Sequence, residues 1–230
     1  MIEYRSMSAK AKESVRKMLE AISEEDTTAF EDFPEILKTP KVCLAAVMKN
    51  GYVIESVPAS LITPELCIAT VKQNGYAIGV IPKTFITPEL CFLAVENDTG
   101  DSILENIPSE FLTQELCLYA VKKCGYLLRY VPFDELTVEV CTAAVLNNDY
   151  ALKFVPKFHL KEVHAALESF QKGIEENRLK TARAMHAEGD SHAKISRVTE
   201  IPLKTLKKRS CLSKKEEKQY ARIHGHNEMG

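Results

Sequence analysis

Five cysteines recur at one spacing, and their chemistry has to be considered first. They are Cys43, Cys67, Cys91, Cys117 and Cys141. Cysteine can bind zinc or form disulfides, but zinc ligands must lie within about 2.3 Å of one ion, and disulfide partners need Cα atoms within about 7 Å. Cysteines on successive packed helices would lie about 10 Å apart. We therefore predict that these five are small, buried apolar residues, and that the chain has no metal site and no cofactor.

Other residues that could carry out chemistry are scattered. The six histidines match no established metal-ligand spacing. We find no glycine-rich phosphate loop, no paired His-Glu helix motif and no nucleophile elbow. Cys124 and Cys211 lie outside the cysteine spacing and are the better candidates for reactive thiols, so rapid labelling of either would support an enzyme. Without such a result, we predict that the chain is not an enzyme.

The cysteines belong to a longer repeating pattern. Six prolines follow one another in steps of 24, 24, 26, 24 and 24 residues: Pro34, Pro58, Pro82, Pro108, Pro132 and Pro156. A threonine lies five residues after each of the first five prolines: Thr39, Thr63, Thr87, Thr113 and Thr137. The cysteine follows each threonine by four residues, and a valine follows each cysteine by four. The chain therefore contains tandem units of about 24 residues.

Each unit has the signals of a helical hairpin. The threonine is a good N-cap, proline follows it at the first helical position in three units, and glutamate lies in the first turn of four. We expect the first helix to end at Asn50-Gly51, Asn74-Gly75 and Cys124-Gly125, where glycine can take the left-handed conformation. A second helix of six or seven residues then runs to the next proline. Because such short helices are unstable alone, the pattern predicts stacked units.

The predicted fold class is therefore all-α, an α-solenoid of about six helical hairpins. Residues 5–23 predict an amphipathic N-terminal capping helix, with Val15 and Met18 on its apolar side. The third unit has two extra residues, and we expect Asp101 to take its tyrosine position. The sixth unit has Lys161 and Ala165 where threonine and cysteine recur, which is typical of a degenerate terminal repeat.

The unit sequence resembles a known repeat family. The segments CLAAVMKNGY (43–52) and CIATVKQNGY (67–76) are similar to a short helical tandem-repeat family of unknown function, with units of the form LAAVxxNGxxLxxxP. The resemblance covers residues 33–170. It implies a helical repeat fold and no particular activity.

The charge of the chain is unevenly distributed. Residues 1–170 contain 16 lysines and arginines against 24 aspartates and glutamates, whereas residues 171–230 contain 14 against 8. The segment 178–215 alone has 11 basic and 3 acidic residues. Such a segment can prefer a polyanionic partner even though the whole chain is slightly acidic.

The basic segment also has the pattern of a trihelical DNA-binding module. We expect one helix to end at Gly189, a second to be capped by Asp190 or Ser191, and a third to follow Pro202. This pattern resembles the C-terminal helix-turn-helix of resolvases and invertases, with Glu200 where the turn glycine is usual. The resemblance implies a last helix that enters the major groove. The expected DNA contacts are Ser191, Lys194, Arg197, Lys204, Thr205, Lys207, Lys208 and Arg209.

Together these patterns predict four regions: a capping helix at 1–30, the repeat domain at 31–170, a helix-turn-helix-like basic module at 171–212 and a polar tail at 213–230. We expect a non-enzymatic scaffold that binds an unknown protein through the repeats and DNA through residues 178–215. The alternative is a solenoid adaptor that binds only protein and has no nucleic-acid role. Neither a signal peptide nor a membrane span is recognisable, so we expect a cytoplasmic protein without membrane contact.

Overall fold

The computed structural model describes residues 4–23, 26–97, 100 and 102–201, and all regular structure in these residues is helical. The all-α class is thereby confirmed. The chain divides into two compact units, Met1–Val163 and His164–Gly230. The predicted third helix after Pro202 and the predicted polar tail at 213–230 lie outside the described residues.

The first unit begins with an amphipathic helix, as predicted. After the 3-10 turn η1 (Tyr4–Ser6), α1 spans Ala9–Ala21. The Ser8 side chain caps this helix by accepting a hydrogen bond from the backbone N–H three residues later. Val15 and Met18 are buried on one side of α1. This side faces α2 (Thr28–Glu31) and α3 (Pro40–Val47). The hydrophobic effect therefore holds α1 against the rest of the unit.

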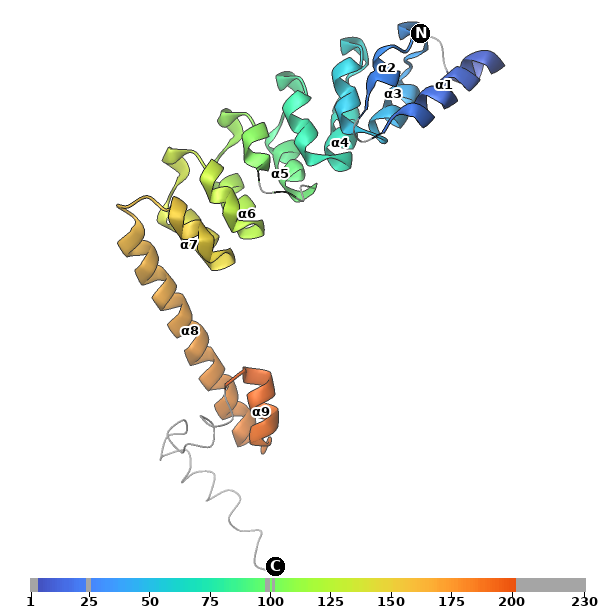
Figure 1. Ribbon diagram of the computed structural model, residues 1–230. Helices are drawn as coiled ribbons and strands as arrows, with labels where there is room; N and C mark the ends of the chain where they lie inside the picture. The colour runs from blue at the N-terminus through green and yellow to red at the C-terminus, as the bar shows by residue number, and fades with distance from the viewer. Residues whose placement is uncertain (1–3, 24–25, 98–99, 101, 202–230) are drawn as a thin grey trace, which may run out of the picture. The chain divides into compact units, whose positions relative to one another are not determined.

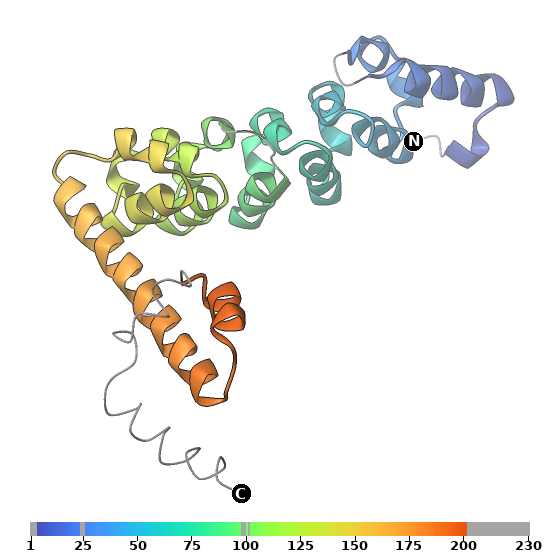
Figure 2. The same cartoon turned by 60° about the horizontal axis from the view of Figure 1, so that its bottom comes forward.

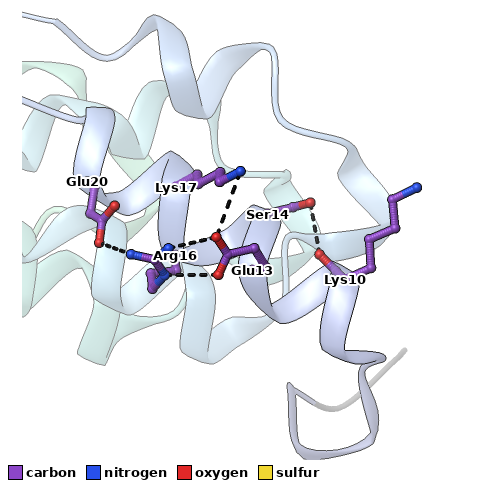
Figure 3. A network of polar contacts seen from close by, with 6 residues as sticks. All are labelled: Lys10, Glu13, Ser14, Arg16, Lys17 and Glu20. Carbon is purple, nitrogen blue, oxygen red and sulfur yellow. Dashed lines mark hydrogen bonds and ion pairs between the residues drawn. The ribbon is translucent and has the colours of Figure 1, made fainter.

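The opposite side of α1 carries a network of ion pairs (Figure 3). The Arg16 guanidinium donates to Glu13 Oε1 at 2.6 Å and to Glu20 Oε1 at 2.7 Å. Lys17 Nζ lies 3.8 Å from the same Glu13 oxygen. These side chains are exposed, so the pairs support the helix only slightly, and the network gives α1 a polar outer face.

The elements after Pro34 follow one another in a recurring order of a short 3-10 turn, an α-helix and a longer 3-10 helix. The short turns are η2 (Glu35–Leu37), η4 (Ala59–Leu61), η6 (Lys83–Phe85), η8 (Ser109–Phe111) and η10 (Phe133–Glu135). The α-helices after α3 are α4 (Pro64–Gln73), α5 (Pro88–Asn97), α6 (Gln114–Lys123) and α7 (Val138–Asn147). The longer 3-10 helices are η3 (Gly51–Ser56), η5 (Gly75–Val80), η7 (Ile103–Asn106), η9 (Gly125–Tyr130) and η11 (Asp149–Phe154). Each α-helix from α3 to α6 contacts the α-helix that follows it (Figures 1 and 2).

The predicted threonine caps are confirmed at the start of each α-helix from α3 to α7. Each threonine Oγ1 accepts a hydrogen bond from the backbone N–H three residues later, at 3.2 to 3.4 Å. In α4, the Glu65 carboxyl accepts a hydrogen bond from the Glu65 backbone N–H and another from the Thr63 hydroxyl. Both lower the pKa of this carboxyl, and the backbone bond contributes more. Glu89 is held in the same way in α5. The first turn of each of these helices is therefore stabilised by local polar contacts.

The predicted left-handed glycine stops are wrong. Among the described residues, only Gly189 and Glu200 have a positive φ. Helix α4 instead ends at Asn74 in an extended conformation, and the Asn74 side chain accepts from the Tyr76 N–H at 3.0 Å. Gly125 lies so close to the next repeat that an added Cβ would be 2.3 Å from the Ala144 carbonyl oxygen. Close approach between neighbouring turns, and not backbone conformation, is the physical reason for the glycine.

The tyrosine position of the third 24-residue repeat also differs from the prediction. Ile103 and Leu104 are buried like Leu127 and Leu128 of the next repeat. Ser102 therefore occupies the tyrosine position that we assigned to Asp101. The Tyr76 hydroxyl lies 3.2 Å from Ser102 Oγ. The two-residue insertion therefore lies wholly before Ser102, which shifts the alignment by one position.

Two more helices are described after η11, and the first of them begins at the end of the first unit and continues into the second. The helix α8 spans Leu160–Ala187 and α9 spans His192–Thr199. Figures 1 and 2 both show α9 beside the C-terminal part of α8. The predicted helix, break and second helix are thus present, with the break at Gly189.

Candidate nucleic-acid interface

The C-terminal part of α8 and α9 share a small hydrophobic core. Ala182, Ile195 and Ile201 are buried, and Leu179 and Met185 pack against them. Val198 of α9 is exposed and lies outside this core. The core fixes α9 against the end of α8 because both helices are otherwise polar.

The turn between α8 and α9 is well defined. Gly189 adopts φ +84°, a left-handed conformation that favours glycine. The Gly189 N–H donates to the His186 carbonyl at 3.0 Å, and the Asp190 N–H donates to the Met185 carbonyl at 3.0 Å. Ser191 then caps α9 by accepting from the Lys194 N–H at 3.3 Å. These contacts pair three of the backbone groups at the end of α8 and the start of α9.

The end of α9 has a second left-handed residue. Glu200 adopts φ +57° at the position where the sequence pattern lacks the usual glycine. Its side chain pairs with Arg178 of α8. The Ser196 hydroxyl donates to the Ile201 carbonyl at 2.7 Å. Glu200 thus takes the left-handed conformation that usually favours glycine, and the turn is formed without one.

The predicted DNA contacts are described only in part. Ser191 is at the start of α9, where its hydroxyl is used as the cap. Lys194 is exposed, and its Nζ lies 2.6 Å from Asp190 Oδ1. Arg197 is exposed and makes no ion pair with any described residue. The remaining predicted contacts lie outside the described residues: Lys204, Thr205, Lys207, Lys208 and Arg209.

Two aromatic arrangements were not predicted from the sequence. His186 and His192 stack across the turn, with ring centroids 5.5 Å apart. In the first unit, Tyr126 and Tyr150 stack at 5.8 Å, and Lys153 Nζ lies 3.8 Å from the Tyr150 ring centroid. The recurring tyrosine was the only sequence signal for the second arrangement, and nothing in the spacing predicted the first.

An apolar groove lies between α3 and α4 in the first unit. It is lined by Pro40, Lys41, Leu44, Leu61, Thr63, Glu65 and Leu66. Leu44 is 40% exposed, and Ile68 on α4 is 42% exposed. Lys41 and Glu65 add one charge of each sign. Such a surface suits a protein segment with an apolar centre and polar flanks.

The five recurring cysteines are buried, as predicted. Burial raises the pKa of the Cys43, Cys67, Cys91 and Cys141 thiols to about 11. The pKa of the Cys117 thiol rises to about 12 for the same reason. Thiols of this kind are protonated and poorly reactive at neutral pH. Cys124 is half-buried, and Cys211 lies outside the described residues.

No group of three or more histidine, cysteine or acidic side chains is arranged to hold a metal ion in the part of the chain that the structure describes. In the same residues, no helix has both the length and the apolar character needed to cross a bilayer.

Comparison with protein-family models, curated proteins and solved structures finds no match to this chain. The two resemblances therefore depend on the quoted residues alone.

Proposed function

We propose that this chain is a non-enzymatic scaffold whose repeats bind a protein and whose basic C-terminal module binds DNA. It would act as a regulator or accessory factor. The observation that carries the DNA part is the backbone around α9: Gly189 is left-handed before the helix, Ser191 caps it, and Glu200 is left-handed where the resembled helix-turn-helix pattern usually has glycine. The excess of 11 basic over 3 acidic residues in the segment 178–215 supports the same conclusion.

The first unit is proposed to be an α-solenoid of about six hairpins, with α1 as its cap. Hydrogen bonds between successive hairpins support this arrangement. The Gln73 side chain accepts from the Gly51 N–H at 2.6 Å and donates to the Lys49 carbonyl at 3.3 Å. Asn147 makes the equivalent pair of bonds to the turn at 122–125, at 2.7 and 2.9 Å. A polar side chain at one register position thus ties its hairpin to the preceding one.

The repeat surface is proposed to bind protein through the groove between α3 and α4. The exposed Leu44 of the groove and the exposed Ile68 of α4 supply apolar area, which drives most protein association. The test compares the proteins captured by the full chain with those captured by a Leu44→Glu, Ile68→Glu double variant. Partners that are lost in this variant but kept by Lys72→Glu, Lys83→Glu support the groove. Equal capture by both variants contradicts it.

The DNA proposal is tested by fluorescence anisotropy of a labelled duplex titrated with the full chain at several salt concentrations. We expect binding that weakens with salt, with a slope of log K against log salt of about −0.9 for each phosphate neutralised. Lys207→Ala with Lys208→Ala should reduce that slope by about 2. Lys72→Ala with Lys83→Ala, which removes the same charge from the first unit, should leave it unchanged.

The second candidate function is a solenoid that binds only protein. It is favoured by the ion pairs of Lys194 with Asp190 and of Arg178 with Glu200, which offset two of the basic charges near α9. Absence of duplex binding even at about 50 mM salt, where phosphate contacts are strongest, would establish this alternative over the DNA proposal.

A further inference from the structure

The fourth and fifth repeats share a cluster of aromatic and basic side chains, which we call the tyrosine–cation patch. Its members lie on the 3-10 helices η9 and η11: Tyr126, Arg129, Tyr130, Tyr150, Lys153 and Phe154. In both repeats the basic residue follows the tyrosine by three positions, and the second aromatic residue follows it by four.

The first three repeats have different residue types at these two positions. The residues there are Glu55 and Ser56, Gly79 and Val80, and Glu105 and Asn106. Each of these repeats still forms an α-helix followed by a 3-10 helix. The fold therefore does not require a basic and an aromatic side chain at these positions, and their presence in the fourth and fifth repeats points to another role.

The rings of the patch pack against one another across the two repeats. Tyr126 and Tyr150 stack with their centroids 5.8 Å apart. The Phe154 ring makes T-shaped contacts at 5.7 Å from Tyr126 and 6.0 Å from Tyr150. Tyr150 is nevertheless 48% exposed, so part of this aromatic cluster faces solvent. Exposed aromatic side chains of this kind are enriched where proteins bind one another.

Two positive charges are held on these rings. The Arg129 guanidinium carbon lies 5.1 Å from the Tyr126 centroid and 4.7 Å from the Tyr130 centroid. The same guanidinium donates to the Tyr126 hydroxyl at 2.6 Å. Lys153 Nζ lies 3.8 Å from the Tyr150 centroid. Both basic residues are exposed, and neither makes an ion pair with a carboxylate of the described residues.

The patch is positive although the surrounding sequence is acidic. Residues 1–170 contain 16 basic and 24 acidic residues, whereas η9 and η11 contain Arg129 and Lys153 with Asp149 as their single acidic residue. Glu105 of η7 attracts Arg129, although no ion pair joins these two described residues. A local positive charge that lacks a paired carboxylate is complementary to an acidic partner.

Carboxylates of a peptide fit these contacts well. Exposed ion pairs are usually weak, because long side chains lose rotamer freedom when they pair. The rings already restrict Arg129 and Lys153, so less freedom is lost when a carboxylate binds. The Tyr126 hydroxyl accepts from Arg129 and keeps its own O–H, which can donate to the same carboxylate.

Single-stranded nucleic acid fits the patch less well than an acidic peptide. Its bases bind by stacking on free faces of aromatic rings. In the patch, the Tyr126 and Tyr150 rings are stacked on each other, and the basic groups of Arg129 and Lys153 lie over them. Little ring face is therefore left for a base.

We propose that the tyrosine–cation patch binds an acidic peptide segment of a partner protein. One carboxylate pairs with Arg129, a second pairs with Lys153, and an apolar side chain packs on the exposed part of the rings. This site is separate from the groove between α3 and α4, and it does not depend on the DNA proposal.

The first experiment titrates a fluorescein-labelled peptide of glutamates around two leucines with the full chain and follows fluorescence anisotropy. Arg129→Ala with Lys153→Ala should weaken binding at least about tenfold, because two charge pairs are lost. Lys72→Ala with Lys83→Ala removes the same charge elsewhere in the first unit and should leave the Kd unchanged. Lys207→Ala with Lys208→Ala should also leave it unchanged. No binding at about 1 mM wild-type chain, or an equal loss in a control variant, would overturn the proposal.

The second experiment locates the bound peptide on the wild-type chain, without any substitution. Amide hydrogen exchange by mass spectrometry should become slower at 125–130 and 149–154 when the glutamate–leucine peptide is added. Protection confined to the groove between α3 and α4, or to the second unit, would contradict the proposed site. A single-stranded oligothymidylate is the competing probe. If it binds, loses affinity in Arg129→Ala with Lys153→Ala, and the peptide does not bind, the patch is a nucleic-acid site and the proposal is wrong.

Discussion

Replacement of Gly125 by alanine tests the close approach between neighbouring hairpins. An added Cβ would lie 2.3 Å from the Ala144 carbonyl oxygen and 3.0 Å from Asn148 Cβ. Since ordinary contacts begin near 3.4 Å, the two turns must separate by about 1 Å. The Gly125 N–H also donates to Asn147 Oδ1 at 2.7 Å, and this bond would lengthen. Because φ at this residue is not positive, alanine itself introduces no backbone strain.

The expected cost follows from these contacts. Overpacking against backbone atoms costs about 1–3 kcal/mol, while the lower entropy of the unfolded alanine chain returns up to about 1 kcal/mol. We expect a net destabilisation of about 2 kcal/mol, or a decrease of about 4–8 °C in Tm for a chain of this size.

Two other glycines provide matched controls, with thermal unfolding followed by far-UV circular dichroism in dilute solution. At Gly51 the nearest atoms, the Gln73 side-chain oxygen and the Thr70 carbonyl oxygen, would both lie 3.0 Å from the added Cβ instead of 2.3 Å, so Gly51→Ala should cost less. Apart from its chain neighbours and the backbone of its own helix, Gly173 has no described atom within 4 Å of the added Cβ, so Gly173→Ala should be neutral or stabilising by up to about 1 kcal/mol. A Tm for Gly125→Ala that equals or exceeds the wild-type value would refute the close approach.

Three further predictions concern local features. Burial raises the pKa of the Cys43 and Cys67 thiols from 9.0 to about 11 and that of Cys117 to about 12, so the unfolded chain loses its protons first and stability should fall as the pH rises above about 9. Cys117→Ala should show a shallower fall in its urea midpoint, and an identical slope would contradict the burial argument. Thr113→Ala should cost about 1 kcal/mol in urea unfolding because α6 loses its cap, whereas Thr113→Ser keeps the hydroxyl and should cost little. Gly189→Ala should destabilise the α8–α9 turn by about 1–2 kcal/mol, because alanine is strained at φ +84°, and faster amide exchange in α9 than in the wild-type chain would show it.

Much of the local structure could be predicted from the sequence because its causes are local. The Thr63 cap and the Gly189 break depend on residues within one turn, and both were predicted correctly. The role of Gly125 could not be predicted, because it depends on Ala144 in the next hairpin. The burial of Ile103 and Leu104 showed that Ser102, and not Asp101, takes the tyrosine position. An insertion shifts an alignment in a way that spacing alone does not reveal.

From the sequence, the candidate interface could be predicted only as a basic segment with a turn between two helices. Ser191 was predicted as a cap and is one. The pairing of Lys194 with Asp190 follows from their four-residue spacing and could have been expected. The pairing of Arg178 with Glu200 joins residues 22 positions apart and needs the folded turn. The stack of His186 on His192 likewise depends on the path of the chain through Gly189.

The central claim is that each hairpin is stable only through its neighbours, and Val95→Asp tests it most directly. Val95 lies on α5 and is 1% exposed, so the variant buries an unpaired carboxylate where α5 contacts α4 and α6. Amide hydrogen exchange by mass spectrometry should show protection lost together in α4, α5 and α6. Loss confined to α5, or protection equal to that of the wild-type chain, would contradict the claim.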